Sequence, residues 1–169
     1  MGYIHAANRK DTTEMNIKTP HIAAVALLVV GILTPQAAAD TPYNAPQRVI
    51  LRAADDSAEA LQKAIAGGLN INATDDDYET ALMKAADDGR RTAVRNLIAA
   101  GADVNLQDED GETALMKAAD EGYADIVQQL INAGANVNLR DEDGETALQK
   151  ARKERHRRVV EILQQAAAR

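Results

Sequence analysis

Apolar residues recur along the chain in pairs of short groups with helical spacing, and the pair returns every 33 residues. In the clearest copy, one group runs from Ala114 to Ala119 and the other from Ile126 to Ile131, so that each group falls on one helix face. Gly122 lies between the groups and Gly134 follows the second, at places where a left-handed residue ends a helix. Each copy therefore predicts two short helices joined by a tight turn.

The repetition is strongest between residues 78–110 and 111–143, which are identical at 22 of 33 aligned positions. A unit of this size cannot bury its apolar face alone and is stable only when it stacks on a neighbour. The polar run from Asp141 to Gly144 has turn chemistry and predicts a hairpin that projects from the stack. The sequence thus predicts an all-α repeat solenoid in which each unit reads helix, turn, helix, hairpin.

This pattern resembles the ankyrin repeat, and the resemblance implies about four units, at residues 47–77, 78–110, 111–143 and 144–169. The family's Thr-Pro-Leu-His becomes Thr113-Ala114-Leu115-Met116, so the histidine hydrogen bonds between units are missing and Met116 is expected to pack in their place. The matching positions are Gly111, Thr113, Leu115, Ala118, Ala119, Gly122, Leu130, Gly134, Ala135, Val137 and Asn138.

The first and last units depart from the pattern, as the polar-faced ends of a solenoid do. Residues 47–77 have one residue fewer between the helices and place Ser57 where later units have Gly. In the last unit Arg152 replaces Ala and Arg155 replaces the inter-helix Gly. A left-handed residue other than Gly costs about 1 kcal/mol, so the turn at Arg155 is expected to be strained or built differently. Both units are interpreted as caps.

Residues 1–39 have the parts of a secretory signal peptide. An apolar run from Ile22 to Leu33 precedes an A-x-A site that ends at Ala39, which predicts cleavage between Ala39 and Asp40. Met15 is a candidate for the true start. The run is shorter than the roughly 20 residues that span a bilayer, and no Cys is present for lipid attachment.

We therefore expect a mature chain without a stable membrane anchor, in the periplasm or, as second choice, secreted. Residues 40–46 contain two prolines and are interpreted as an extended linker.

Composition agrees with small-residue packing, because 46% of the residues are hydrophobic but Trp, Phe and Cys are absent. Charge is divided along the chain. Residues 40–149 contain 9 Lys and Arg against 22 Asp and Glu, whereas residues 150–169 contain 7 against 2. The predicted solenoid is an acidic rod with a basic end.

Carboxylates recur at the predicted hairpin tips, and the ankyrin resemblance implies that these tips belong to a binding surface. Their charge favours a protein partner with a basic surface. Tyr78 stands where the next two units have Gly111 and Gly144, which suggests an exposed anchor, although local packing explains it equally well. The alternative for the whole edge is a solvated turn. The candidate protein-binding residues are Asp77, Tyr78, Glu79, Glu109, Asp110, Glu112, Glu142, Asp143 and Glu145.

Metal binding and catalysis find little support. Residues 108–111 resemble part of an EF-hand loop, but Leu106 and Lys117 stand where the loop needs oxygen ligands, so no metal or cofactor is expected. His156 is the only histidine after the predicted cleavage site, and it is assigned to the inter-helix turn of the last unit. The hairpin carboxylates lack the apolar surroundings that general acid catalysis needs.

The basic segment at residues 150–158 suggests nucleic acid, but the acidic remainder would repel phosphate. A solvated capping helix is favoured, with anionic lipid head groups or an acidic partner as alternatives. Together these observations predict a monomeric, periplasmic, non-catalytic protein–protein interaction module with a protective role. The alternatives are an immunity protein that neutralises a toxin, or an accessory regulator of a periplasmic enzyme such as a catalase.

Overall fold

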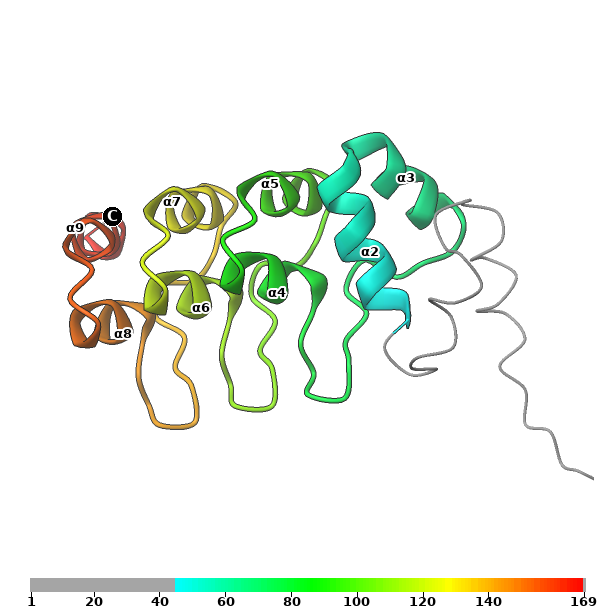
Figure 1. Ribbon diagram of the computed structural model, residues 1–169. Coiled ribbons are helices and arrows are strands. Elements are labelled where there is room, and N and C mark those ends of the chain that lie inside the picture. Colours follow the sequence, from blue (N-terminus) through cyan, green and yellow to red (C-terminus); the bar gives the residue numbers. More distant parts are fainter. Residues whose placement is uncertain (1–44, 169) are drawn as a thin grey trace, which may run out of the picture.

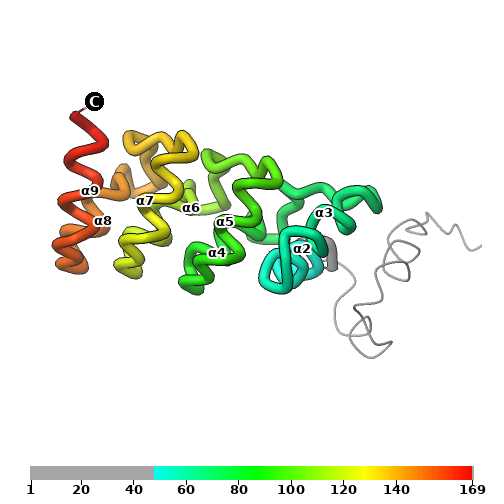
Figure 2. Tube along the Cα trace, turned by 90° about the horizontal axis from the view of Figure 1, so that it is seen from above, coloured from blue at the N-terminus to red at the C-terminus, as the bar shows by residue number. Residues whose placement is uncertain are grey.

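The computed structural model describes residues 45–168, and these form four stacked helix pairs with hairpins projecting from one side (Figure 1). In Figure 1 the first helices of the later units, α4, α6 and α8, form one row, and the second helices, α5, α7 and α9, form another above it. The view from above shows the same stacking order (Figure 2). The helices are α2 (Ala45–Asp56), α3 (Ala58–Ala66), α4 (Ala81–Asp87), α5 (Arg91–Ala99), α6 (Ala114–Asp120), α7 (Ala124–Asn132), α8 (Ala147–Lys153) and α9 (Arg157–Ala167).

This arrangement confirms the all-α repeat solenoid with helix, turn, helix and hairpin in each unit. Helix α2 begins at Ala45, inside the segment that the prolines had indicated as linker. The signal peptide, its cleavage between Ala39 and Asp40, and the alternative start at Met15 lie outside the described residues and stay predictions.

Threonine side chains start the first helix of each later unit. The hydroxyl oxygens of Thr80 and Thr113 accept hydrogen bonds from the backbone N–H of Met83 and Met116, at 3.2 Å in both cases. These bonds satisfy one of the donors that a helix N-terminus leaves free. Both threonines are 2% exposed, so the caps also belong to the interface between units.

The core lies between the units and consists of alanine together with leucine, isoleucine, valine and methionine. Met83 and Met116 are 1% exposed, which confirms that methionine packs where the family usually has histidine. Leu115 and Leu130 are buried as well. Fully buried alanines such as Ala118 let α4 pack against α6, and α6 against α8, at short range. A chain with few aromatic residues can therefore fill this core.

The turns between the paired helices interlock from one unit to the next. Gly122 has a left-handed backbone (φ 80°), and a Cβ there would lie 2.5 Å from Nδ1 of His156 in the following unit. A Cβ at Gly89 would meet the ring of Tyr123 at 2.7 Å. His156 lies in the predicted turn, and its Nε2 is also 2.7 Å from the carbonyl oxygen of Asp120 in the preceding unit. Glycine is thus required by conformation and by the side chain of the next unit.

The last unit of the described chain carries polar side chains on its outer face. Arg155 adopts the same left-handed conformation as the glycines (φ 63°), so the strained form of the turn is the one present. Gln149 and Arg152 are exposed, although the residues at their positions in the preceding unit, Met116 and Ala119, are buried. Polar side chains stand where another unit would have to pack.

Candidate functional site

Each hairpin contains one aspartate that is buried against the stack. The side chains of Asp75, Asp108 and Asp141 are 4% or 5% exposed. Oδ1 of Asp108 accepts hydrogen bonds from the backbone N–H of Asp110 (3.1 Å) and Glu112 (2.7 Å), which closes the hairpin. The equivalent oxygen of Asp141 accepts from Glu145 at 2.8 Å. These aspartates shape the hairpins and leave their second oxygen for another partner.

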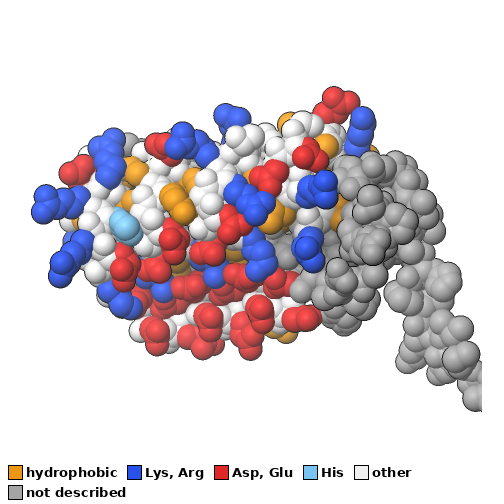
Figure 3. Space-filling view, in the orientation of Figure 1, with side chains coloured by type: hydrophobic (Ala, Val, Ile, Leu, Met, Phe, Trp, Pro, Cys, Tyr) orange, Lys and Arg blue, Asp and Glu red, His pale blue; other side chains and the backbone are white. Residues whose placement is uncertain are grey.

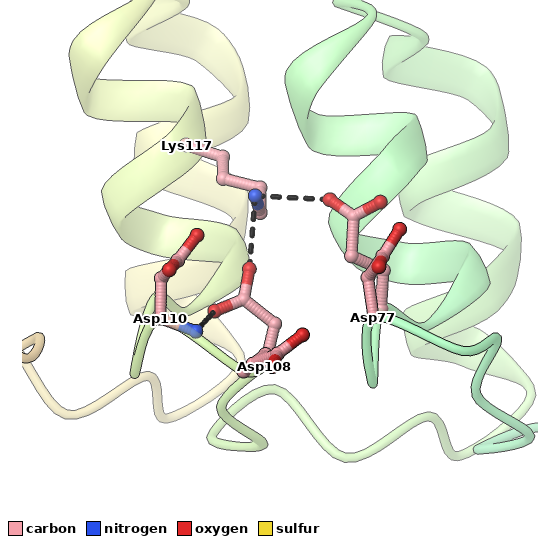
Figure 4. A pocket seen from close by; sticks show the side chains of 6 residues that line it. Asp77, Asp108, Asp110 and Lys117 are labelled. Carbon is pink, nitrogen blue, oxygen red and sulfur yellow. Dashed lines mark hydrogen bonds and ion pairs between the residues drawn. The ribbon is translucent and has the colours of Figure 1, made fainter.

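That partner is a lysine on the helix that follows the hairpin, which is the first helix of the next unit. Nζ of Lys117, from α6, lies 2.9 Å from Oδ2 of Asp108 and 2.9 Å from Oε1 of Glu79, which belongs to the preceding unit (Figure 4). It also lies 3.2 Å from Oε2 of Glu112. One ammonium group therefore bridges three carboxylates and joins two units.

The same contacts repeat along the stack. Glu79 also pairs with Lys84, and Oε1 of Glu112 lies 2.5 Å from Nζ of Lys150 in the following unit. We call this continuous set the lysine ladder. It comprises Asp75, Glu79, Lys84, Asp108, Glu112, Lys117, Asp141 and Lys150.

The contacts within the ladder shift the pKa values of Lys117 and Glu112. Burial alone would lower the pKa of Lys117, but hydrogen bonds to Asp108 and Glu79 outweigh it and hold the pKa above its ordinary value. Burial would likewise raise the pKa of Glu112, whereas hydrogen bonds from Lys150 and Lys117 lower it. Lys117 and Glu112 are therefore both held in their charged forms near neutral pH.

Two of the predicted binding residues, Glu79 and Glu112, are members of this ladder. Their side chains are 17% and 22% exposed and are bound by lysines of the helices, so these two glutamates do not lie at the hairpin tips, where the sequence had placed them. A third, Glu145, is 29% exposed and lies 3.6 Å from Lys153. The missed signal was the recurrence of Lys84, Lys117 and Lys150 at the repeat period, because each helix otherwise turns apolar residues towards the hairpins.

The remaining candidates lie at the ends of the hairpins and are exposed. We call them the tip carboxylates: Asp76, Asp77, Glu109, Asp110, Glu142 and Asp143. None of them forms an ion pair with another described residue. Figure 3 shows Asp and Glu side chains gathered along this lower edge of the molecule.

Backbone hydrogen bonds align the hairpin ends. The N–H of Glu109 donates to the carbonyl oxygen of Asp77 (3.1 Å), and the N–H of Glu142 donates to that of Asp110 (2.9 Å). Gly111 permits this approach, since a Cβ there would lie 3.1 Å from the backbone of Asp141. The tips form one row rather than three independent loops.

Tyr78 is the one aromatic residue at the hairpin ends within the described range. Its side chain is 61% exposed, and its backbone is left-handed (φ 59°), where Gly111 and Gly144 have φ 74°. The predicted exposure of Tyr78 is confirmed. No described residue covers its ring enough for local packing to account for its presence.

A shallow hollow of about 250 Å³ separates the first and second hairpin ends. Figure 4 shows Asp77 on one side and Asp108, Asp110 and Lys117 on the other. Glu79 and Glu109 complete its lining, so no apolar side chain contributes. The hollow can take a cationic side chain, but it offers nothing to an apolar small molecule.

Other kinds of site find no support in residues 45–168. Within this range no group of three or more His, Cys, Asp or Glu side chains is arranged to hold a metal ion. The helices of the same range are all too short or too polar to cross a membrane.

Comparison with known families agrees with the geometry. The family model for ankyrin repeats (three copies) matches residues 49–141 and 86–169. The chain therefore belongs to the ankyrin repeat family, and the predicted fold class is confirmed. Ankyrin repeats indicate a protein–protein interaction module. No curated protein matches the sequence.

Proposed function

We propose that this chain is an exported, non-catalytic module that holds a basic protein partner on its tip carboxylates. The observation that carries the proposal is the division of the hairpin acids into two sets. Ladder members such as Asp108 are buried and neutralised by lysine, whereas the tip carboxylates are exposed and unpaired among the described residues. The charge that remains for a partner is therefore concentrated along one edge.

The tips are also held in place before any partner arrives. The ladder aspartates fix each hairpin, and the bonds from Glu109 to Asp77 and from Glu142 to Asp110 fix the hairpins to one another. A surface that is already ordered loses less conformational entropy on binding. Its uniform charge would speed encounter with a basic surface and would make the association rate depend on salt.

Export belongs to the same proposal and rests on the signal-peptide pattern of residues 1–39, whereas the protective role rests on the resemblance to exported bacterial ankyrin repeat proteins. A secreted toxin that the chain neutralises and a periplasmic enzyme that it regulates, such as a catalase, both satisfy the proposal if they present a basic surface. Intact-mass measurement of periplasmic material tests export: the expected chain begins at Asp40, and one that retains Ile22 to Leu33 would contradict it.

Binding is tested with a matched pair of variants. Glu109→Lys/Glu142→Lys reverses two tip carboxylates, and Glu121→Lys/Glu154→Lys reverses two exposed glutamates of the same spacing at the opposite ends of the inner helices. After a partner is captured from periplasmic extract, its association rate is measured at low and high salt. We expect the tip variant to associate at least about tenfold more slowly at low salt, and the control much less so.

Glu112 and Glu145 are left unchanged in this design because both lie in ion pairs with lysine. Circular dichroism verifies that both variants keep their helical signal. A tip variant that binds as fast as the parent would mean that the edge is only solvated.

A further inference from the structure

The terminal face of the last unit presents three arginines at positions that contact the next unit elsewhere in the stack. Arg152 occupies the position of the fully buried Ala119. Arg155 occupies that of Gly122, which His156 of the following unit covers. Arg157 occupies that of Arg91, which pairs with Asp125 of the following unit at 2.6 Å. With no further unit in the described chain, all three face outward along the stack.

These end-face arginines are exposed, and none forms an ion pair with a described residue. The neighbouring cations differ, because Lys153 lies 3.6 Å from Glu145, and Arg158 lies 3.4 Å from Glu161. Cations gather at the α8 and α9 end in Figure 3, away from the acidic hairpin edge. Three unpaired arginines are thus gathered on the end face of the last unit.

We infer that this end face docks peripherally on a membrane surface of anionic phospholipid. All three end-face arginines belong to the last helix pair, α8 and α9, and the turn between them, so one flat anionic surface can approach them together. Guanidinium groups match phosphate oxygens through paired hydrogen bonds, and basic clusters are attracted by anionic head groups.

An acidic protein is the weaker occupant of the same face. Protein interfaces are anchored by buried apolar or aromatic side chains, yet the large hydrophobic residues that are exposed in the described chain, Tyr78 and Tyr123, both lie in other units. A nucleic acid presents the same phosphate chemistry, and binding to a DNA duplex is therefore one outcome of the test. Docking on lipid needs only the cations and involves no insertion, so salt should reverse it.

The test uses the whole chain and two triple variants that remove equal charge. Arg152→Gln/Arg155→Gln/Arg157→Gln neutralises the end face, and Arg48→Gln/Arg52→Gln/Arg95→Gln neutralises three exposed arginines of the first and second units, none of which pairs with a described residue. Binding is measured by co-sedimentation with phosphatidylcholine vesicles that contain about one third phosphatidylglycerol, and with pure phosphatidylcholine vesicles. Thermal melts verify that both variants are folded.

We expect the parent to bind the anionic vesicles at low salt and to leave them as salt is raised. A Lys or Arg near such a surface changes binding by about fivefold, so the end-face variant should lose at least tenfold in affinity while the control triple loses much less. Equal loss in both triples, binding to pure phosphatidylcholine that the end-face variant leaves unchanged, or absence of binding would each overturn the inference. Equally tight, arginine-dependent binding to a DNA duplex would overturn the assignment to lipid.

Discussion

Replacing Lys117 by methionine should destabilise the stack far more than removing an ordinary surface lysine. The side chain of Lys117 is 12% exposed and lies within 3.2 Å of carboxylates from Glu79, Asp108 and Glu112. Removing one partner of a buried ion pair costs about 3–5 kcal/mol, because the remaining charge is left without compensation.

The lower end of that range applies here. Glu79 keeps Lys84 and Glu112 keeps Lys150, so only Asp108 loses its ionic partner, and Asp108 still accepts two backbone hydrogen bonds. A loss of about 3 kcal/mol is a large share of the roughly 5–15 kcal/mol that hold a small domain together. For a domain of this size it corresponds to a melting temperature lower by roughly 10 °C.

The assay is urea unfolding followed by far-ultraviolet circular dichroism, with Lys153→Met as the control. Lys153 is 65% exposed and lies 3.6 Å from Glu145, so its loss should cost less than about 1 kcal/mol. Adding Asp108→Asn to Lys117→Met should restore part of the stability, since the amide oxygen can still accept from the backbone while the buried charge is gone. If Lys117→Met unfolds at the same urea concentration as Lys153→Met, the ladder does not stabilise the stack.

Two further predictions concern the turns and the response to acid. Arg155→Gly should raise the unfolding free energy by up to about 1 kcal/mol, because the left-handed turn (φ 63°) no longer holds a side chain. Gly122→Ala should lower it by more than about 1 kcal/mol, since the added Cβ would lie 2.5 Å from the ring of His156. The melting temperatures of the two variants should therefore shift in opposite directions, and shifts of the same sign would contradict the argument. Burial alone would raise the pKa values of Glu79 and Glu112, but their lysine partners lower them below the value of the unfolded chain. The ionised glutamates therefore stabilise the folded state above about pH 4.3, the pKa of glutamate in the unfolded chain, and this stabilisation is lost as the pH falls through their lower pKa values in the folded state. When unfolding of the parent is measured from pH 6 downward, the urea concentration at the midpoint should decrease once the pH is below about 4. A midpoint that stays constant in that range would refute the argument that lysine contacts lower the pKa values of these glutamates.

The repeat architecture could be predicted from sequence because its determinants are local and periodic. Gly122 and Gly134 mark helix ends, Thr113 marks a helix start, and the apolar spacing defines which face is buried. The conformation of Arg155 follows from the same register, since it stands where the other units have glycine. Each of these inferences uses residues within one unit.

The division of the hairpin acids could not be predicted in this way. Glu79 and Lys117 are 38 positions apart and meet only because one unit stacks on the next. In sequence, Glu112 and Glu109 are equivalent polar residues of one turn, whereas in the structure one is bound by two lysines and the other is exposed. The contact of His156 with Asp120 was missed for the same reason, because it joins neighbouring units.

Stability and recognition are coupled through the ladder. Asp108 uses one oxygen to fix the hairpin backbone at Asp110 and Glu112, and the other to bind Lys117 on the first helix of the next unit. A change that releases Lys117 would therefore loosen the tips as well as the interface between units. Partner binding should then weaken in Lys117→Met even though Lys117 contributes a positive charge, and removing that charge would by itself favour a basic partner. The sign of the change in affinity thus separates loss of order at the tips from a simple effect of net charge.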